Sequence, residues 1–281
     1  MPHPDFTIRP MSPEDLTRAI HWAADEGWNP GLDDAEAFYG VDPQGFLMGW
    51  LGETPVTAIS VVRHNPAFGF LGFYLCDPAH RGRGWGFATW QAGIAHLGSR
   101  TIGLDGVPDQ QDNYRSSGFA FAHTSHRYRG TIEGQVHPAC RAPTAADMPA
   151  MLAIDQSVSG TDRGAYMTAW LRDCPTRKTL VLKQDAMITA LGTIRACRSG
   201  HKIGPLFAPD PATAETLIRA LAAQADARDI MIDVPEPNAP ATSLVQSLGL
   251  EPIFACARMY RGTPSARRLP SIFGETTFEL G

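Results

Sequence analysis

A short basic segment rich in glycine has the composition of an anion-binding loop. It comprises Arg81-Gly82-Arg83-Gly84-Trp85-Gly86 and stands between a predicted strand, residues 69–76, and a predicted helix, residues 87–97. Glycine allows main-chain N–H groups to approach a ligand, and a helix start adds unpaired donors and the positive end of the helix dipole. The two arginines add positive charge. The segment therefore predicts a binding site for a phosphate or pyrophosphate group.

The spacing of the glycines separates this loop from two other phosphate-binding loops. A dinucleotide-binding loop, G-x-G-x-x-G, would need glycine where Phe87 stands, and the Gly-Lys-Ser/Thr of a nucleotide P-loop does not occur in the chain. The remaining pattern, R-x-x-G-x-G from Arg81 to Gly86, resembles the acyl-coenzyme A loop of the GNAT acetyltransferase superfamily. A second motif, Tyr114-Arg-Ser-Ser-Gly118-Phe119, resembles the Y-x-x-x-G-F that follows this loop in the superfamily. Two motifs in this order outweigh the alternatives, a solvated glycine-rich turn and a half-buried packing tyrosine.

This resemblance implies direct transfer of an acetyl group from acetyl-coenzyme A (acetyl-CoA) to an amine. The main chain of residues 74–76 would pair with the pantetheine arm, and an N–H near Leu75 or Cys76 would face the developing oxyanion. Tyr114 would be the general acid, because an ordinary phenol, with a pKa of about 10, is protonated at neutral pH. An acyl-enzyme on Cys76 is disfavoured, since the sequence places no histidine partner beside it. The residues expected to bind the cofactor are Tyr74, Leu75, Cys76, Arg81, Gly82, Arg83, Gly84, Trp85 and Gly86.

The general base and the acceptor pocket are less well defined by the sequence. Superfamily members often use a glutamate on the central strand or a chain of water molecules as the base, and the predicted strand contains no carboxylate here. The base candidates are Asp25, Glu26 and Asp105, and for the first two an ordinary role as charges at a helix end is the stronger interpretation of each alone. Trp28 and Phe38 could line the acceptor pocket or belong to the core.

The two halves of the sequence resemble each other at a nearly constant offset. Several matched pairs, among them Gly72 and Gly204, lie 132 residues apart. So long a period indicates a duplicated domain. The second copy lacks both motifs, because Ala212–Leu217 stands where the glycine loop is expected and Val245 replaces the tyrosine. Glu215 in that stretch would also repel a pyrophosphate.

Each half predicts the same order of elements: a strand, a helix capped by Ser12 or Thr144, a strand pair, a central strand, a long helix, a strand, a short helix and a final hairpin. This order predicts the α/β (α+β) class, with two tandem GNAT folds that each form a mixed, mostly antiparallel twisted sheet flanked by helices. The predicted domains are an acetyl-CoA-binding GNAT N-acetyltransferase domain at 1–132 and a degenerate GNAT-like domain at 133–262. The apolar tail, 263–281, is expected to dock on the protein.

The composition limits the classes of partner. Hydrophobic residues make up 43% of the chain and the net charge is −5 at pH 7, which argue for ordinary globular cores and against a broad nucleic-acid surface. No apolar run approaches the length of a membrane span, and the first residues lack the pattern of a signal peptide. Five scattered cysteines without zinc spacing predict reduced thiols, no metal site and a cytoplasmic location.

Together these features predict an acetyl-CoA-dependent N-acetyltransferase that moves an acetyl group directly to a primary amine of a small molecule or peptide. The alternative is a non-catalytic acyl-CoA-binding or sensing module, in which the second domain binds a partner. Retention of Tyr114 beside an intact loop favours the enzyme. A homodimer that forms through the blocked cleft of the second domain is a further hypothesis.

Overall fold

The computed structural model describes residues 5–185 and 187–281. The elements of the first half are the strands β1 (Phe6–Pro10), β2 (Phe46–Leu51), β3 (Thr54–Arg63), β4 (Phe68–Cys76), β5 (Thr101–Gly106) and β6 (Ala120–Thr131) and the helices α1 (Pro13–Asp25), α2 (Asp34–Tyr39), α3 (Trp85–Leu97) and α4 (Gln111–Ser116). The elements of the second half are the strands β7 (Cys140–Arg141), β8 (Arg177–Gln184), β9 (Met187–Ala196), β10 (His201–Phe207), β11 (Asp229–Pro235), β12 (Glu251–Arg261) and β13 (Ile272–Gly274) and the helices α5 (Met148–Ser159), α6 (Gly164–Trp170), α7 (Pro211–Gln224) and α8 (Ala239–Ser247).

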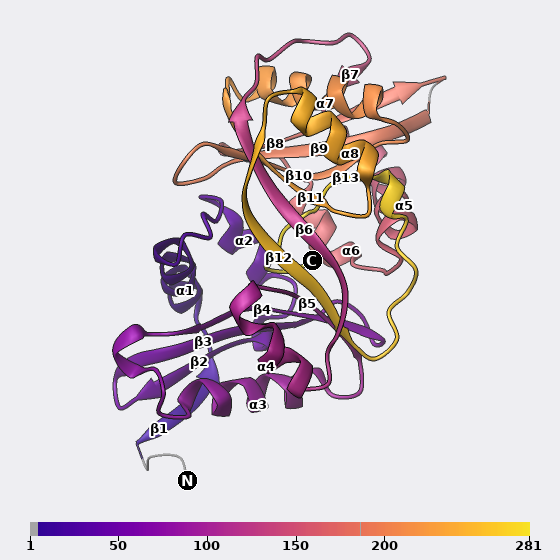
Figure 1. The fold of residues 1–281 in the computed structure, drawn as a ribbon. Helices are drawn as coiled ribbons and strands as arrows, with labels where there is room; N and C mark the ends of the chain where they lie inside the picture. Colours follow the sequence, from indigo (N-terminus) through magenta and orange to yellow (C-terminus); the bar gives the residue numbers. More distant parts are fainter. Residues whose placement is uncertain (1–4, 186) are drawn as a thin grey trace.

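The strands of both halves form one continuous sheet (Figure 1). Over the described residues its order is β1-β2-β3-β4-β5-β12-β6-β11-β10-β9-β8-β7, and β13 pairs with β10 beside this path. Neighbouring strands are antiparallel except for β4 with β5 and β10 with β11, which are parallel. Helices α3 and α7 pack on the central strands of their own halves. The predicted fold class, α/β with a mostly antiparallel twisted sheet, is confirmed.

The last strand of each repeat joins the sheet of the other half. β12 lies between β5 and β6, and β6 lies between β12 and β11. Figure 1 shows the two long strands running side by side between the halves. The final hairpin predicted for each repeat is therefore wrong. In β6 the buried and half-buried positions alternate from His123 to Arg127 without glycine or proline, which suits one long strand.

Two buried ion pairs hold the exchanged strands at equivalent places. Arg127 on β6 donates to the two carboxylate oxygens of Asp233 on β11 at 2.7 and 2.9 Å. Arg258 on β12 donates to both oxygens of Asp105 on β5 at 2.7 Å. Because all four side chains are buried, each charge depends on its partner for solvation.

The predicted helix starts are confirmed. Ser12 Oγ accepts a hydrogen bond from the Asp15 N–H at 3.2 Å, the Asp15 carboxylate accepts one from the Ser12 N–H at 3.1 Å, and Pro13 opens α1. Thr144 and Asp147 form the same capping box in the short turn before α5. The repeat is therefore visible in the local structure as well as in the sequence.

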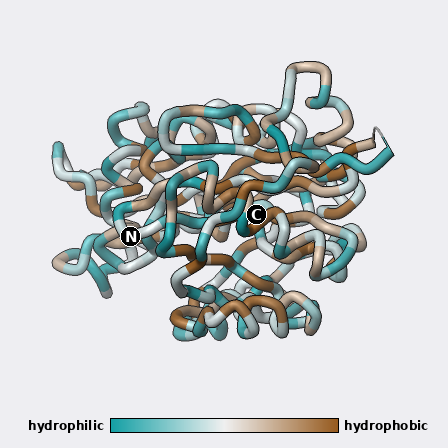
Figure 2. Tube along the Cα trace, turned by 90° about the horizontal axis from the view of Figure 1, so that it is seen from above, coloured by the Kyte–Doolittle hydropathy of each residue, from teal (hydrophilic) through white to brown (hydrophobic). Residues whose placement is uncertain are grey.

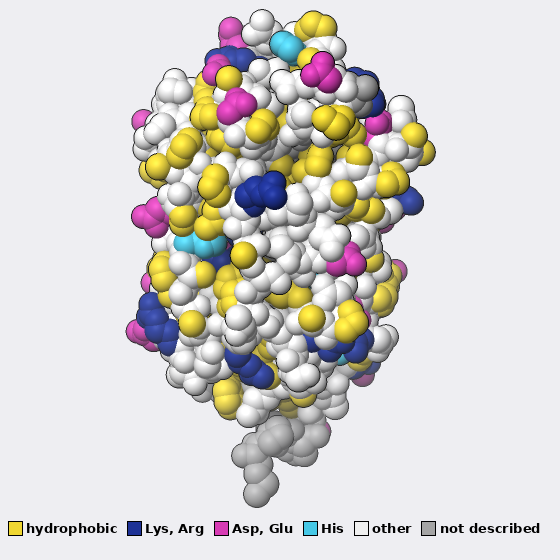
Figure 3. Space-filling view, turned by 90° about the vertical axis from the view of Figure 1, so that its right-hand side faces the viewer, with side chains coloured by type: hydrophobic (Ala, Val, Ile, Leu, Met, Phe, Trp, Pro, Cys, Tyr) yellow, Lys and Arg dark blue, Asp and Glu magenta, His cyan; other side chains and the backbone are white. Residues whose placement is uncertain are grey.

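Hydrophobic segments concentrate in the interior and hydrophilic segments in the outer loops (Figure 2). One core cluster spans both halves and includes Phe38, Phe73 and Trp170. On the face shown in Figure 3, acidic and basic side chains are interspersed, with no broad area of one sign. Among the described helices, none has both the length and the apolar character needed to cross a membrane.

Candidate active site

The parallel strands β4 and β5 separate and open a groove in the first half. Their pairing ends at Leu71 and Leu104, whereas β4 continues to Cys76. The register between β3 and β4 shifts at the same place, and Phe73 there has a φ of 45°. Beyond Leu71 the edge of β4 that faces β5 is therefore free to pair with an extended ligand, as with an added strand.

The groove brings together all nine residues predicted to bind the cofactor. The end of β4 forms one part of its wall, and the glycine-rich loop forms another. Burial raises the pKa of the Cys76 thiol, which disfavours a nucleophilic thiolate at this position. The lining residues are Glu26, Tyr74, Leu75, Cys76, His80, Arg81, Gly82, Arg83, Gly84, Trp85, Gly86, Phe87, Val107 and Gln110.

The glycines give the loop an open conformation. Gly82 and Gly84 have φ angles of 75° and 83°, a region that favours glycine, and no atom lies within 4 Å of the place of a Cβ on either residue. Gly84 is the N-cap of α3, so no side chain occupies the first N–H groups of that helix. Arg81 Nε donates to the Cys76 carbonyl at 3.0 Å, and its guanidinium also pairs with Glu26. The loop thus offers main-chain donors and positive charge to an anion.

Tyr114 on α4 is a buried phenol beside the groove. Its ring stacks on Trp90 with centroids 5.5 Å apart, and only 7% of the residue is exposed. Among the described residues, no group forms a hydrogen bond with its hydroxyl. Burial raises the pKa of Tyr114, and burial raises the pKa of neighbouring Tyr74 to about 12. Both phenols are therefore protonated at neutral pH, as a proton donor must be.

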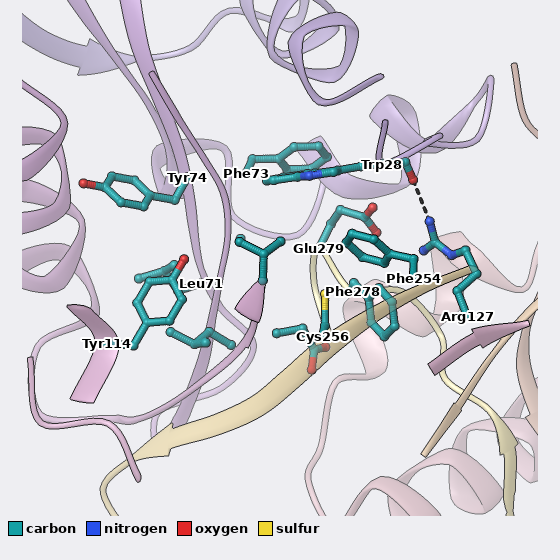
Figure 4. A pocket seen from close by; sticks show the side chains of 14 residues that line it. Trp28, Leu71, Phe73, Tyr74, Tyr114, Arg127, Phe254, Cys256, Phe278 and Glu279 are labelled. Carbon is teal, nitrogen blue, oxygen red and sulfur yellow. Dashed lines mark hydrogen bonds between the residues drawn. The ribbon is translucent and has the colours of Figure 1, made fainter. Parts of the chain in front are cut away.

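A second cavity lies at the junction of the two halves (Figure 4). Tyr74 and Val107 line both this cavity and the groove, so the two spaces are neighbours. Figure 4 shows Tyr74 and Tyr114 on one side of the cavity, opposite Phe278 and Glu279. The lining residues are Trp28, Leu71, Gly72, Phe73, Tyr74, Leu104, Asp105, Val107, Tyr114, Arg127, Phe254, Cys256, Phe278 and Glu279.

Several residues of this cavity come from segments that sequence analysis did not assign to the site. They are Arg127 of β6, Phe254 and Cys256 of β12, and Phe278 and Glu279 of the tail. The strand exchange supplies the first three, and nothing in the sequence indicated that exchange. For the tail, the apolar residues predicted a docked segment but gave no position. Burial raises the pKa of Cys256 well above its ordinary value, so this thiol is not a thiolate at neutral pH.

The tail reaches the cavity because it is anchored along its length. After β13, the main-chain N–H of Glu275 donates to the Asp233 carbonyl at 2.8 Å, and its carboxylate accepts from Arg267 at 2.6 and 3.0 Å. Further on, the Leu280 carbonyl accepts from His64 Nε2 at 2.9 Å. Burial lowers the pKa of His64 to about 4, so the imidazole is neutral at pH 7 and keeps the proton that this bond needs on Nε2.

The structure separates the three predicted base candidates. Asp25 is exposed and pairs with an arginine of the second half at 3.4 Å. Glu26 lies in the groove, against Arg81 of the loop. Asp105 lines the second cavity, but both of its oxygens accept hydrogen bonds from Arg258. Burial raises the pKa of Asp105, and Arg258 opposes this shift.

The two aromatic residues predicted for the acceptor pocket have different places. Trp28 lines the second cavity, and its carbonyl accepts hydrogen bonds from Arg127 and from Lys202. Phe38 is fully buried and stacks on Trp170 at 5.7 Å, so it does not line this cavity. Of the two interpretations of Phe38, the structure favours the core, because α2 directs this side chain into the core between the halves.

The position predicted for the lost glycine loop in the second half is wrong. Ala212–Leu217 lies inside α7, and Glu215 pairs there with Arg219 at 2.8 Å. The counterpart of the loop is the shorter connection at residues 208–210, between β10 and α7. It also lacks glycine, so the conclusion that the second half has no such loop still holds.

The counterpart of the groove is closed in the second half. β10 and β11 also separate, but β13 enters the gap and pairs with β10 at Leu206 and Phe207. The carboxylate of Asp210 caps α7 by accepting from the Thr213 N–H at 2.8 Å, so it occupies the helix start that would otherwise attract an anion. Val245 stands at the place of the tyrosine and is buried.

The fold and the open groove define the class of the protein as an acyltransferase of the GNAT type, which uses an acyl-CoA donor. A family model described as "Acetyltransferase (GNAT) family" matches residues 14–119, and one described as "Acetyltransferase (GNAT) domain" matches residues 151–274. A curated relative, the holothin acyltransferase of Pseudoalteromonas sp. (strain SANK 73390), is 30% identical over 99% of this chain and 96% of its own length. The chain therefore belongs to the GNAT acetyltransferase family, with two such domains in tandem.

Solved structures share the fold over nearly the whole chain. A proposed acetyltransferase from Pyrococcus horikoshii superposes with a TM-score of 0.82 at 21% identity and covers 100% of this chain and 98% of its own. A tandem GNAT protein from the clavulanic acid biosynthesis pathway superposes with a TM-score of 0.65 at 14% identity and covers 92% of this chain and 100% of its own. The tandem arrangement is thus shared with another protein of known structure.

Proposed function

We propose that the protein transfers an acetyl group from acetyl-CoA directly to a primary amine of a small molecule. The observation that carries this proposal is that the open groove and the second cavity are neighbours, with Tyr74 and Val107 in the walls of both. A donor in the groove and an acceptor in the cavity would there be close enough to react, beside Tyr114. Acetyl-CoA supplies the reactive thioester when bound.

Each part of the groove has a distinct task in this proposal. The uncapped start of α3, with Gly82 and Gly84, would hold the pyrophosphate, for which the open space around both glycines leaves room. The free edge of β4 would pair with the pantetheine arm. A main-chain N–H near Leu75 or Cys76 would stabilise the oxyanion. Tyr114 would donate its proton to the leaving sulfur.

The second cavity supports a small acceptor rather than a peptide. Its walls come from the first half, from β12 and from the tail, so it is surrounded by several segments. The rings of Trp28, Phe73, Phe254 and Phe278 make much of this wall, and such rings suit an amine carried on an apolar or aromatic body. The relative named a holothin acyltransferase is a precedent for acyl transfer by a chain of this length and domain order.

The test is acetyl-CoA consumption with a panel of primary amines, such as benzylamine, phenylethylamine, tryptamine, spermidine and a short peptide. Loss of the proton donor in Tyr114→Phe is expected to lower kcat about 10²-fold, with unchanged affinity for coenzyme A. Tyr128→Phe is the matched control, because this buried tyrosine lies in the core of the second half. Binding of coenzyme A without turnover of any amine would instead support the non-catalytic module.

A further inference from the structure

The geometry points to Glu279 as the residue that binds the ammonium group of the acceptor and takes its proton, an inference that rests on the proposed function. None of the three base candidates from the sequence has a free carboxylate in the second cavity. Glu279 reaches this cavity from the tail, more than 150 residues beyond those candidates along the chain.

The carboxylate of Glu279 is buried and has no hydrogen-bond partner among the described residues. The residue is 4% exposed, and its Oε2 is buried without a hydrogen bond. Within the described part of the chain, no ion pair engages this carboxylate either. Three other buried carboxylates at the junction differ, since Asp105, Asp233 and Glu275 each receive two hydrogen bonds from an arginine. A buried polar atom that lacks a partner has a free-energy cost, which a ligand donor in the cavity would remove.

The surrounding protein fixes the position of Glu279. Its main-chain carbonyl lies against β4, so closely that a Cβ on Gly72 would collide with it. On the next residue, the Leu280 N–H donates to Thr277 Oγ1 at 3.0 Å and the carbonyl accepts from His64. In Figure 4 the side chain extends into the cavity between Phe73 and Phe278. These contacts of Glu279 and Leu280 fix the main chain of the tail and therefore hold the carboxylate in the cavity.

The charges that face Glu279 leave its hydrogen-bonding capacity unused. Arg127 interacts electrostatically with Glu279, but its guanidinium donates to Asp233 and to the Trp28 carbonyl. Lys202 Nζ donates to the same carbonyl at 3.0 Å. An alkylammonium has three donors and would satisfy the carboxylate directly. The titratable and charged groups that interact with Glu279 are Arg127 on β6, Arg195 on β9, Lys202 on β10 and Cys256 on β12.

The proposed proton transfer fits the stoichiometry of amide formation. Glu279 takes one proton from the ammonium, and the neutral amine nitrogen forms a bond to the thioester carbonyl carbon. The carbon–sulfur bond then breaks, and Tyr114 gives its proton to the thiolate. The second proton that leaves the nitrogen restores the phenol, and Glu279 releases its proton to water. One ammonium and one thioester thus give one amide, one thiol and one proton.

The test measures kcat/KM of the wild type and of Glu279→Gln between pH 7 and pH 9. The substrate is the amine that the wild type acetylates fastest among those named above. Without the carboxylate, the reaction depends on free amine from solution, and an alkylammonium has a pKa of about 10. We expect Glu279→Gln to be about 10²-fold slower at pH 7 and less than about 10-fold slower at pH 9. Glu279→Asp, which keeps the charge, should recover part of the activity at pH 7. Glu215→Gln is the matched control and should keep the wild-type profile, because this partly exposed side chain lies on α7 of the second half, outside the groove and the second cavity.

Calorimetry separates this inference from the proposed function. The amine is titrated into the wild type and into Glu279→Gln, each with coenzyme A bound, and thermal melting verifies that both are folded. Weaker amine binding by the variant supports the role of Glu279 in recognition, even if the wild type shows no turnover and the proposed function fails. An equal loss of activity at every pH, an unchanged rate, or no amine binding by the wild type would overturn the inference.

Discussion

The two halves share one fold and differ in what occupies the gap between their parallel strands. In the first half the gap between β4 and β5 is an open groove. In the second half β13 fills the gap between β10 and β11. The separation of the strands is thus common to both halves, and among the described residues the gap is open only in the half for which we propose donor binding.

The helix starts beside the two gaps repeat this contrast. α3 begins after Gly84, which leaves its first N–H groups without a side-chain partner. α7 begins after Asp210, whose carboxylate already accepts from one of the equivalent groups. Main-chain structure around the tyrosine motif is retained in both halves, since the Phe119 N–H donates to the Tyr114 carbonyl and the Leu250 N–H donates to that of Val245, each at 3.0 Å. The main chain around this motif is therefore the same in both halves, and the side chain at the tyrosine position differs.

The largest expected effect concerns a feature that both halves share. Arg258→Ala should destabilise the protein by about 3–5 kcal/mol, because it leaves Asp105 charged and buried without a partner. Arg127→Ala should cost a similar amount, since its pair with Asp233 is equivalent. The measurement is urea unfolding followed by tryptophan fluorescence.

The double variant Arg258→Met/Asp105→Leu is the control for this pair. It removes both charges and should be clearly more stable than Arg258→Ala alone. If either single change cost less than about 1 kcal/mol, the exchanged strands would not depend on these ion pairs.

The second prediction concerns how each half holds the tail. In the first half the anchor is His64, which is neutral because burial lowers its pKa to about 4, whereas in the second half Asn238 Nδ2 donates to the Ile272 carbonyl at 2.8 Å and does not titrate. An unfolded histidine has a pKa of about 6.5, so the unfolded chain takes up a proton first as the pH falls. The contribution of neutral His64 to the free energy of unfolding is thus fully present above pH 6.5. As the pH falls to about 4, the free energy of unfolding should decrease by about 3 kcal/mol through this residue.

The measurement is the free energy of unfolding across this pH range, compared between the wild type and His64→Gln. Glutamine can still donate to the Leu280 carbonyl but has no charge to gain. The difference between the two curves isolates the histidine from all other titrating groups. A difference that does not change with pH would show that folding leaves the pKa of His64 unchanged.

Local patterns explain why part of this molecule could be predicted from sequence. The capping boxes at Ser12 and Thr144 depend on residues only three positions away, and the structure confirms both. The family and the fold class followed from two motifs and the repeat, and they are also confirmed. The roles of the loop and of Tyr114 in binding and catalysis stay predictions, although the structure places the loop residues together in one groove.

The features that sequence analysis missed depend on contacts between distant residues. Arg258 meets Asp105 across 153 positions and His64 meets Leu280 across 216, and no local pattern encodes such pairings. The wrong alignment of Ala212–Leu217 has another cause. The constant offset between the halves does not hold there, because the second half has a much shorter connection between its central strand and long helix.

The third prediction converts the open helix start into the closed type. Gly84→Asp introduces at α3 the residue type that caps α7, and its charge would repel a pyrophosphate. We expect coenzyme A affinity to fall about 30-fold, or about 2 kcal/mol, in calorimetric titrations. Gly84→Asn is the matched control, because it has the same shape and tolerates the φ of 83° equally well but carries no charge. Equal losses in the two variants would mean that shape rather than charge decides binding.

The smallest expected effect distinguishes the two gaps by what the tail does in each. Gly72 and Gly204 occupy equivalent positions, and a Cβ on either would collide with a tail carbonyl, that of Glu279 or that of Glu275. Each change to alanine should destabilise the protein by about 1–2 kcal/mol through overpacking. Only Gly72→Ala should also raise the KM for the amine, because only there does the displaced segment line the second cavity. The measurement is a steady-state titration of the amine at saturating acetyl-CoA. If Gly204→Ala raised the KM as much as Gly72→Ala does, the tail would move as one unit. The filled gap of the second half and the second cavity would then be coupled.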